Sequence, residues 1–67
     1  MCAAKVIKEY LNNNGIKQSF VANKVHISPE LLRRSLDGTR VLKADEFIAI
    51  CSVLSLDLEY FYQNQIA

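Results

Sequence analysis

Only three residues, His26–Ser28, separate two segments whose apolar residues recur with the period of an α-helix. The segment before them, residues 16–25, reads IKQSFVANKV. Its apolar stripe consists of Phe20, Val21, Ala22 and Val25. The segment after them, about residues 29–36, places Leu32 and Leu36 on one side. Because two helices joined so tightly cannot run side by side, they must cross at a steep angle.

The second of these segments carries the start and stop signals of a helix. Ser28 can cap its first amides, Pro29 suits the first helical position, and Gly38 stands just past its end. With the leucines turned inward, the outer side carries Pro29, Glu30, Arg33, Arg34 and Asp37. The two segments therefore predict a helix-turn-helix unit over about residues 17–36.

Three further helices are expected from the same periodicity. Residues 3–13 bury an apolar stripe and end at Asn14 or Gly15, either of which can adopt a left-handed conformation. Residues 44–55 begin with two acids and are then almost wholly apolar, which predicts the most buried helix of the chain. Residues 56–63 form a short last helix capped by Asp57. The chain is thus expected to be all-α, a single five-helix domain over residues 1–67.

Composition excludes several classes of protein. Two cysteines and one histidine are too few for a disulfide framework or a zinc site, so we expect no metal and no cofactor. The sequence shows no signal peptide and no membrane-spanning stretch, which favours a reducing, cytoplasmic setting. It also shows no nucleophile–base set and no phosphate-binding glycine loop. We therefore expect a protein that is not an enzyme and does not associate with membranes.

The charges are divided unevenly along the chain. Residues 1–40 carry seven Lys and Arg against three Asp and Glu, whereas residues 41–67 carry one against four. This asymmetry suggests a basic face toward an anionic partner and an acidic side away from it. Small domains also divide their charges unevenly by chance, so the split alone favours a nucleic-acid partner only slightly.

The ordered set of these residues resembles the phage repressor and Cro-like helix-turn-helix proteins, also called the XRE family, over about residues 5–62. The matching positions are Gln18, Val21, Ala22, Ile27, Ser28, Leu32, Leu36, Asp37, Gly38, Arg40, Phe47, Ile50, Leu54, Leu56, Leu58 and Phe61. The resemblance implies a compact five-helix fold like that of lambda repressor, with the third helix in the major groove of double-stranded DNA.

Two positions depart from the family pattern. His26 stands where the family usually has a glycine with positive φ, which histidine tolerates better than most residues. Ser35 stands where relatives bury a larger apolar residue. We expect Leu31, Leu36 or Phe20 to fill the space beside Ser35.

The resemblance also implies roles on DNA. The base-contacting residues would be Pro29, Glu30, Arg33 and Arg34, the arginines reading guanine. The phosphate-contacting residues would be Lys17, Gln18, Ser28, Thr39 and Arg40. As isolated residues, Glu30 and Arg34 would form only a surface ion pair, and Ser28 would only cap its helix. Lys5, Lys8 and Lys24 are interpreted as ordinary solvated charges.

The expected function is that of a transcriptional repressor of bacterial or phage type, binding a palindromic operator as a homodimer. Candidate dimer residues are Leu58, Phe61, Tyr62 and Ile66, and packing of the last helix against the first is the competing role for these side chains. Two alternatives stay open. The chain could be an antitoxin with a toxin partner or a restriction-modification controller of the same fold, or it could be a helical protein-interaction module that does not bind DNA.

Overall fold

The computed structural model describes residues 2–65, and within this range it contains helices and no strand. The five helices are α1 (Ala3–Asn13), α2 (Gln18–Val25), α3 (Pro29–Asp37), α4 (Ala44–Leu54) and α5 (Leu58–Gln65). The expected all-α class is therefore confirmed for the described residues. The observed helix ends differ from those expected from the sequence by two residues at most.

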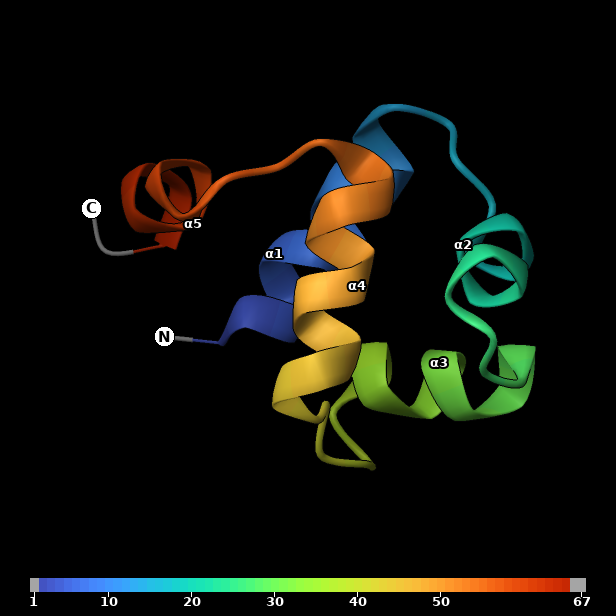
Figure 1. Cartoon of the computed structure of the whole chain (residues 1–67). Coiled ribbons are helices and arrows are strands. Elements are labelled where there is room, and N and C mark those ends of the chain that lie inside the picture. Colours follow the sequence, from blue (N-terminus) through green and yellow to red (C-terminus); the bar gives the residue numbers. More distant parts are fainter. Residues whose placement is uncertain (1, 66–67) are drawn as a thin grey trace.

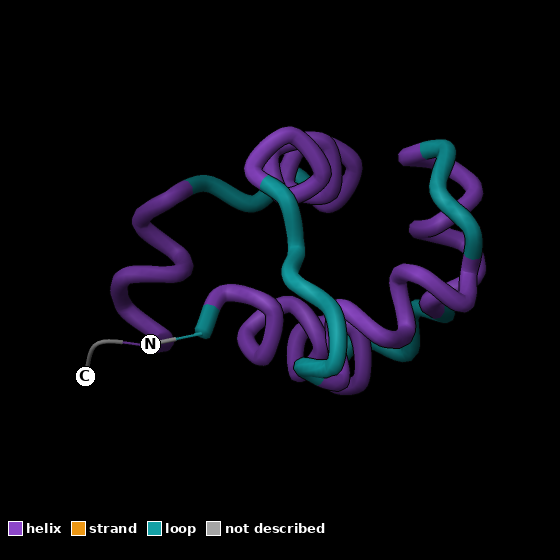
Figure 2. The backbone as a smooth tube through the Cα atoms, turned by 90° about the horizontal axis from the view of Figure 1, so that it is seen from below, coloured by secondary structure: helices purple, strands orange, loops and turns teal. Residues whose placement is uncertain are grey.

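Helix α4 lies between α5 and the pair formed by α2 and α3 (Figure 1). In Figure 1, α4 stands upright in front of α1, with α2 and α3 on one side and α5 on the other. Helix α2 is seen nearly end-on while α3 lies across the view, so their axes cross steeply, as their short connection requires. From below, α4 is itself seen end-on and separates α5 from α2 (Figure 2).

All five helices contribute to one apolar core. Helix α1 packs against α3 and α5, and α2 packs against α3 and α4. The side chains at most 1% exposed include Ile7 and Leu11 of α1, Val21 of α2, Leu32 of α3 and Ile50 of α4. At about 25 cal/mol per Å² of apolar surface removed from water, this shared core supplies the main force that holds α3 in place.

The expectation that residues 44–55 form the most buried helix is wrong. Only Ile50 of α4 is fully buried, and Ile48 on the other face is 66% exposed. Helix α1 contributes four buried residues instead. A wholly apolar run has no polar face to mark the solvent side, so the sequence could not show that neighbouring helices cover only one side of α4.

Local backbone signals place the ends of α2 and α3. The Ser28 hydroxyl accepts a hydrogen bond from the Leu31 amide at 3.1 Å, and Pro29 occupies the first position of α3. Gly38 ends α3 with a φ of 89°. His26 adopts the expected left-handed conformation at the end of α2, with a φ of 63°. At the end of α1, Gly15 rather than Asn14 takes the positive φ.

We expect the substitution His26→Gly to stabilise the domain by about 1 kcal/mol, because a left-handed backbone is strained for residues with a Cβ atom and free of that strain for glycine. In a domain of this size the gain raises the thermal midpoint by roughly 4–8 °C, which circular dichroism can measure. Lys24→Gly is the control, since glycine inside a helix costs about 0.5–1 kcal/mol. Equal changes at both positions would contradict the prediction.

Candidate nucleic-acid interface

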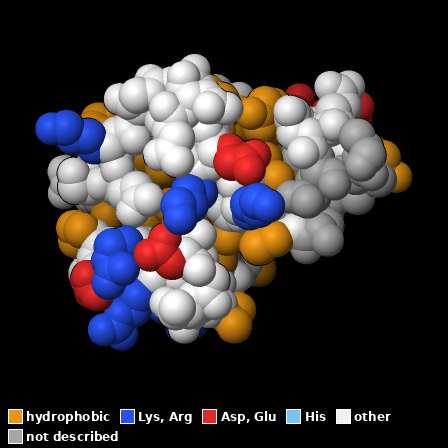
Figure 3. Space-filling view, turned by 180° about the vertical axis from the view of Figure 1, so that it is seen from behind, with side chains coloured by type: hydrophobic (Ala, Val, Ile, Leu, Met, Phe, Trp, Pro, Cys, Tyr) orange, Lys and Arg blue, Asp and Glu red, His pale blue; other side chains and the backbone are white. Residues whose placement is uncertain are grey.

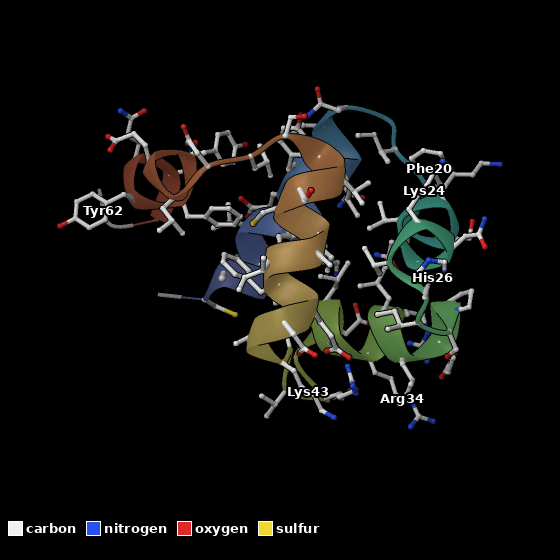
Figure 4. All side chains as sticks on the ribbon, viewed as in Figure 1. Phe20, Lys24, His26, Arg34, Lys43 and Tyr62 are labelled. Atoms are coloured by element: carbon white, nitrogen blue, oxygen red, sulfur yellow. The ribbon has the colours of Figure 1, made fainter. Side chains whose placement is uncertain are left out.

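The outer face of α3 presents the residues expected to contact bases. Pro29, Glu30, Arg33 and Arg34 are all exposed. The opposite face of α3 is anchored by Leu32, Ser35 and Leu36, which are at most 4% exposed. Arg34 extends away from the other helices (Figure 4). The leucine spacing therefore turns both guanidinium groups to solvent, where a large ligand could reach them.

Arg33 and Arg34 share one carboxylate partner. Arg33 donates to both oxygens of Glu30, from Nε to Oε1 at 3.2 Å and from Nη2 to Oε2 at 2.6 Å. Its Nη1 donates to Oδ2 of Asp37 at 3.1 Å. Arg34 donates only from Nε, to the same Glu30 Oε2, at 3.2 Å. Lys8 of α1 completes the chain of ion pairs by donating to Asp37 Oδ1 at 2.9 Å.

These contacts keep both carboxylates ionised. Hydrogen bonding by Arg33 lowers the pKa of Glu30, and hydrogen bonding by Lys8 lowers the pKa of Asp37. The cluster thus holds three cations against two anions. On the face seen from behind, Lys and Arg side chains lie beside Asp and Glu side chains (Figure 3). Glu30 and Arg34 therefore form the surface ion pair that was expected of them as isolated residues.

The residues expected at phosphates occupy different settings. Lys17 is exposed immediately before α2, and Gln18 is half-buried at its first position. Ser28 caps α3, as its place before Pro29 predicts. The Thr39 hydroxyl donates to the Arg34 carbonyl at 3.2 Å, which closes the end of α3. Of these residues and Arg40, only Lys17 has a charged group outside the ion pairs found within residues 2–65.

Arg40 is engaged by the protein itself. Its Nη1 and Nη2 donate to the two oxygens of Glu46 at 3.0 Å each, and Nη1 also donates to Ser35 Oγ at 2.8 Å. The side chains of Arg40 and Glu46 are only 22% and 12% exposed. This contact with Arg40 lowers the pKa of Glu46. The guanidinium ties α3 to the start of α4, a role that sequence reasoning missed.

Of the three residues expected to fill the space beside Ser35, Leu36 is buried, whereas Phe20 and Leu31 are 51% and 38% exposed. Ser35 itself is buried and its hydroxyl accepts from Arg40. The buried hydroxyl of Ser35 is therefore satisfied by a hydrogen bond from a charged donor.

Lys43 is a candidate residue that sequence reasoning missed. It immediately precedes α4 and extends to the same side of the molecule as Arg34 (Figure 4). Within residues 2–65 it forms no ion pair. Lys24 lies differently, with its Nζ 5.6 Å from the centre of the Phe20 ring on the far side of α2. The sequence signal that could have identified Lys43 was its position in the connection between Gly38, which ends α3, and the start of α4.

The residues expected at a dimer interface divide into core and surface. Phe61 is 5% exposed and packs edge-on against Phe47, with ring centres 5.0 Å apart. Leu58 and Tyr62 are 73% and 65% exposed, and Tyr62 points outward in Figure 4. Ile66 lies outside the described residues. The exposed Leu58 borders an apolar hollow of about 360 Å³ between α4 and α5 that Ile48 also lines.

Comparisons with protein families, curated proteins and solved structures find no match to this chain. Residues 2–65 bring together no group of three or more His, Cys, Asp and Glu side chains that could hold a metal ion. Among these residues no helix has the length and apolar character needed to cross a membrane.

Proposed function

We propose that the chain is a sequence-specific DNA-binding regulator of transcription in which α2, residues 26–28 and α3 act as a helix-turn-helix unit. The observation that carries this proposal is the guanidinium of Arg34, exposed on a helix whose opposite side is anchored by the fully buried Leu32. A guanidinium in the major groove can donate two hydrogen bonds to O6 and N7 of guanine. Helix α3 would therefore supply the base contacts.

Cations around α3 would hold the DNA backbone. Lys43 extends on the side of Arg34 and has no acidic partner within the described residues. Lys17 stands at the N-terminus of α2, where free backbone amides also favour an anion. Contacts of this kind fix the register of a protein on DNA, while base contacts supply sequence preference.

We propose that two copies bind a palindromic operator. A single domain of 67 residues buries little surface on DNA, which limits the affinity of a monomer. Ile48, Leu58 and Tyr62 expose apolar surface on α4 and α5 that a second copy could cover. A dimer with two-fold symmetry places its two α3 helices about one turn of the DNA double helix apart. By occupying the operator it would exclude polymerase and repress transcription.

Selection from a pool of random DNA duplexes tests this function. The wild-type chain is expected to enrich a palindrome that contains guanine in each half-site. Affinity for the enriched duplex should fall steeply between 50 and 200 mM salt, because phosphate binding releases counterions. A pool that shows no enrichment after repeated rounds would refute sequence-specific binding, and enrichment of asymmetric sites would refute the two-fold dimer.

A helical protein-interaction module is the second candidate function. It is favoured by the nearly neutral charge of the α3 surface and by exposed apolar side chains, including Phe20 on α2. Salt separates the two candidates. An interaction module would show no affinity for DNA, and its affinity for a protein partner would depend little on salt. The affinity of a DNA-binding protein for DNA would fall as salt is added, because binding releases counterions.

We expect Lys43→Gln to weaken binding to all duplexes about equally and to reduce the slope of log affinity against log salt by about 0.9, the value for one lost phosphate contact. Fluorescence anisotropy titrations at several salt concentrations measure both effects. Lys24→Gln removes the same charge from the side of α2 that faces away from Arg34, and should leave the slope unchanged. Indistinguishable slopes for the two variants would remove Lys43 from the interface.

A further inference from the structure

The two arginines on the outer face of α3 differ in how many of their nitrogens are engaged. All three nitrogens of Arg33 donate to carboxylates, two of them to Glu30 and one to Asp37. Arg34 donates from Nε alone. Its Nη1 and Nη2 therefore make no hydrogen bond within the described residues. The two side chains have similar exposure, so the difference lies in their partners.

The free edge of Arg34 is suited to read a base. Two neighbouring N–H donors are needed to contact O6 and N7 of guanine together. Nη1 and Nη2 provide such a pair at the tip of Arg34, while the bond from Nε to Glu30 restrains the rest of the guanidinium. A restrained donor pair loses less side-chain entropy on binding than a freely rotating one. Arg34 is thus both available and partly preorganised.

Arg33 restrains Glu30 in turn. The same Glu30 oxygen, Oε2, accepts from Arg33 Nη2 at 2.6 Å and from Arg34 Nε at 3.2 Å. Arg33 also bonds the other oxygen of Glu30, so the carboxylate is held at both ends. Asp37 holds the far side of Arg33 and is itself bound by Lys8 of α1. The restraint on Arg34 therefore extends through three residues to Lys8 on another helix.

Withdrawing Arg33 from this cluster to contact DNA would be unfavourable. Glu30 would keep only its single bond from Arg34, and Asp37 only its bond from Lys8. Both carboxylates would then face the negative charge of the phosphates with fewer compensating donors. No such loss follows from using Nη1 and Nη2 of Arg34.

We propose that Arg33 is a positioning residue that holds Glu30, and through it Arg34, so that Arg34 alone presents a guanine-reading edge on α3. This inference rests on the proposed function and adds to it a division of roles between two adjacent arginines. In each copy of the chain only Arg34 then contacts guanine, although the guanidinium groups of both arginines can donate two hydrogen bonds to that base.

The test compares Arg33→Lys with Arg34→Gln on the duplex that the wild-type chain selects. Preference is measured as the ratio of affinities for that duplex and for duplexes with one base pair changed. Arg34→Gln should reduce the guanine preference at one position per half-site by about 10-fold or more and leave other positions unchanged. Arg33→Lys keeps the charge but lacks the fork that binds both oxygens of Glu30. It should reduce the preference at that same position several-fold without altering the salt slope.

The remaining outcomes decide against the inference in distinct ways. Loss of preference at a second base position in Arg33→Lys would mean that both arginines read DNA. An unchanged preference in Arg33→Lys, with or without a lower thermal midpoint, would mean that Arg33 has no positioning role. A wild-type chain that selects no sequence would overturn the proposed function, and this inference with it. Only the first two outcomes overturn the inference while the proposed function stands.

Discussion

Replacing Arg34 with alanine is expected to reduce sharply the preference of the chain for its operator while the fold persists. The Arg34 side chain is 54% exposed and its one hydrogen bond within the described residues is to Glu30, also at the surface. Its removal therefore takes nothing from the core. A bidentate contact to guanine contributes about 1–3 kcal/mol of discrimination, which corresponds to roughly 5- to 150-fold per half-site.

Competition binding measures this effect directly. The ratio of affinities for operator and random duplex should fall by about this factor for each half-site in Arg34→Ala, and the far-ultraviolet circular dichroism spectrum should match that of the wild type. Lys24→Ala is the matched control, because it removes an exposed cation from the side of α2 turned away from Arg34. A ratio that stays the same in Arg34→Ala would refute the assignment of this residue as the reader of guanine.

Replacing Leu32 with alanine is expected to have the opposite consequence, a loss of the fold. Leu32 is fully buried beneath the outer face of α3, in contact with the shared core. A buried leucine truncated to alanine costs about 2–5 kcal/mol, since apolar contacts are lost and a cavity remains. A core of this size supplies only about 3–5 kcal/mol in total. Much of the Leu32→Ala protein should therefore be unfolded at 25 °C.

Urea unfolding followed by circular dichroism measures this loss. Leu31→Ala is the control, because Leu31 is the adjacent leucine in the sequence and is 38% exposed. It makes the same chemical change at the surface of α3 and should cost less than about 1 kcal/mol. Similar losses for the two variants would mean that α3 is not anchored by the face that the structure buries.

Much of the local structure was predictable from the sequence. Ser28, Pro29 and Gly38 define the limits of α3, because capping, a fixed φ and a positive φ act on neighbouring atoms. His26 was recognised as a positive-φ residue for the same reason. The exposure of Arg33 and Arg34 followed from the spacing of Leu32 and Leu36 along a helix. Each of these predictions depends on contacts between residues at most four positions apart.

Predictions that depended on packing between helices were less accurate. Phe20 was expected in an apolar stripe and is half exposed, and α4 was expected to be the most buried helix and is covered on one face. The hydrogen bonds from the Arg40 guanidinium to Glu46 and Ser35 were not predicted. The apolar character of a side chain indicates that its burial lowers the free energy, but it does not identify which neighbouring helix will cover it.

The sequence by itself determined that the chain is helical, where each helix begins and ends to within two residues, and that two arginines lie on the outer side of the third helix. Tertiary structure decided which charges are already neutralised. Lys8 reaches Asp37 from another helix, and Arg40 closes onto Glu46, while Lys43 is left without an acidic partner within the described residues. The reason is physical. Helical periodicity is a property of neighbouring residues, whereas an ion pair between elements depends on the distance that the packed core sets between them.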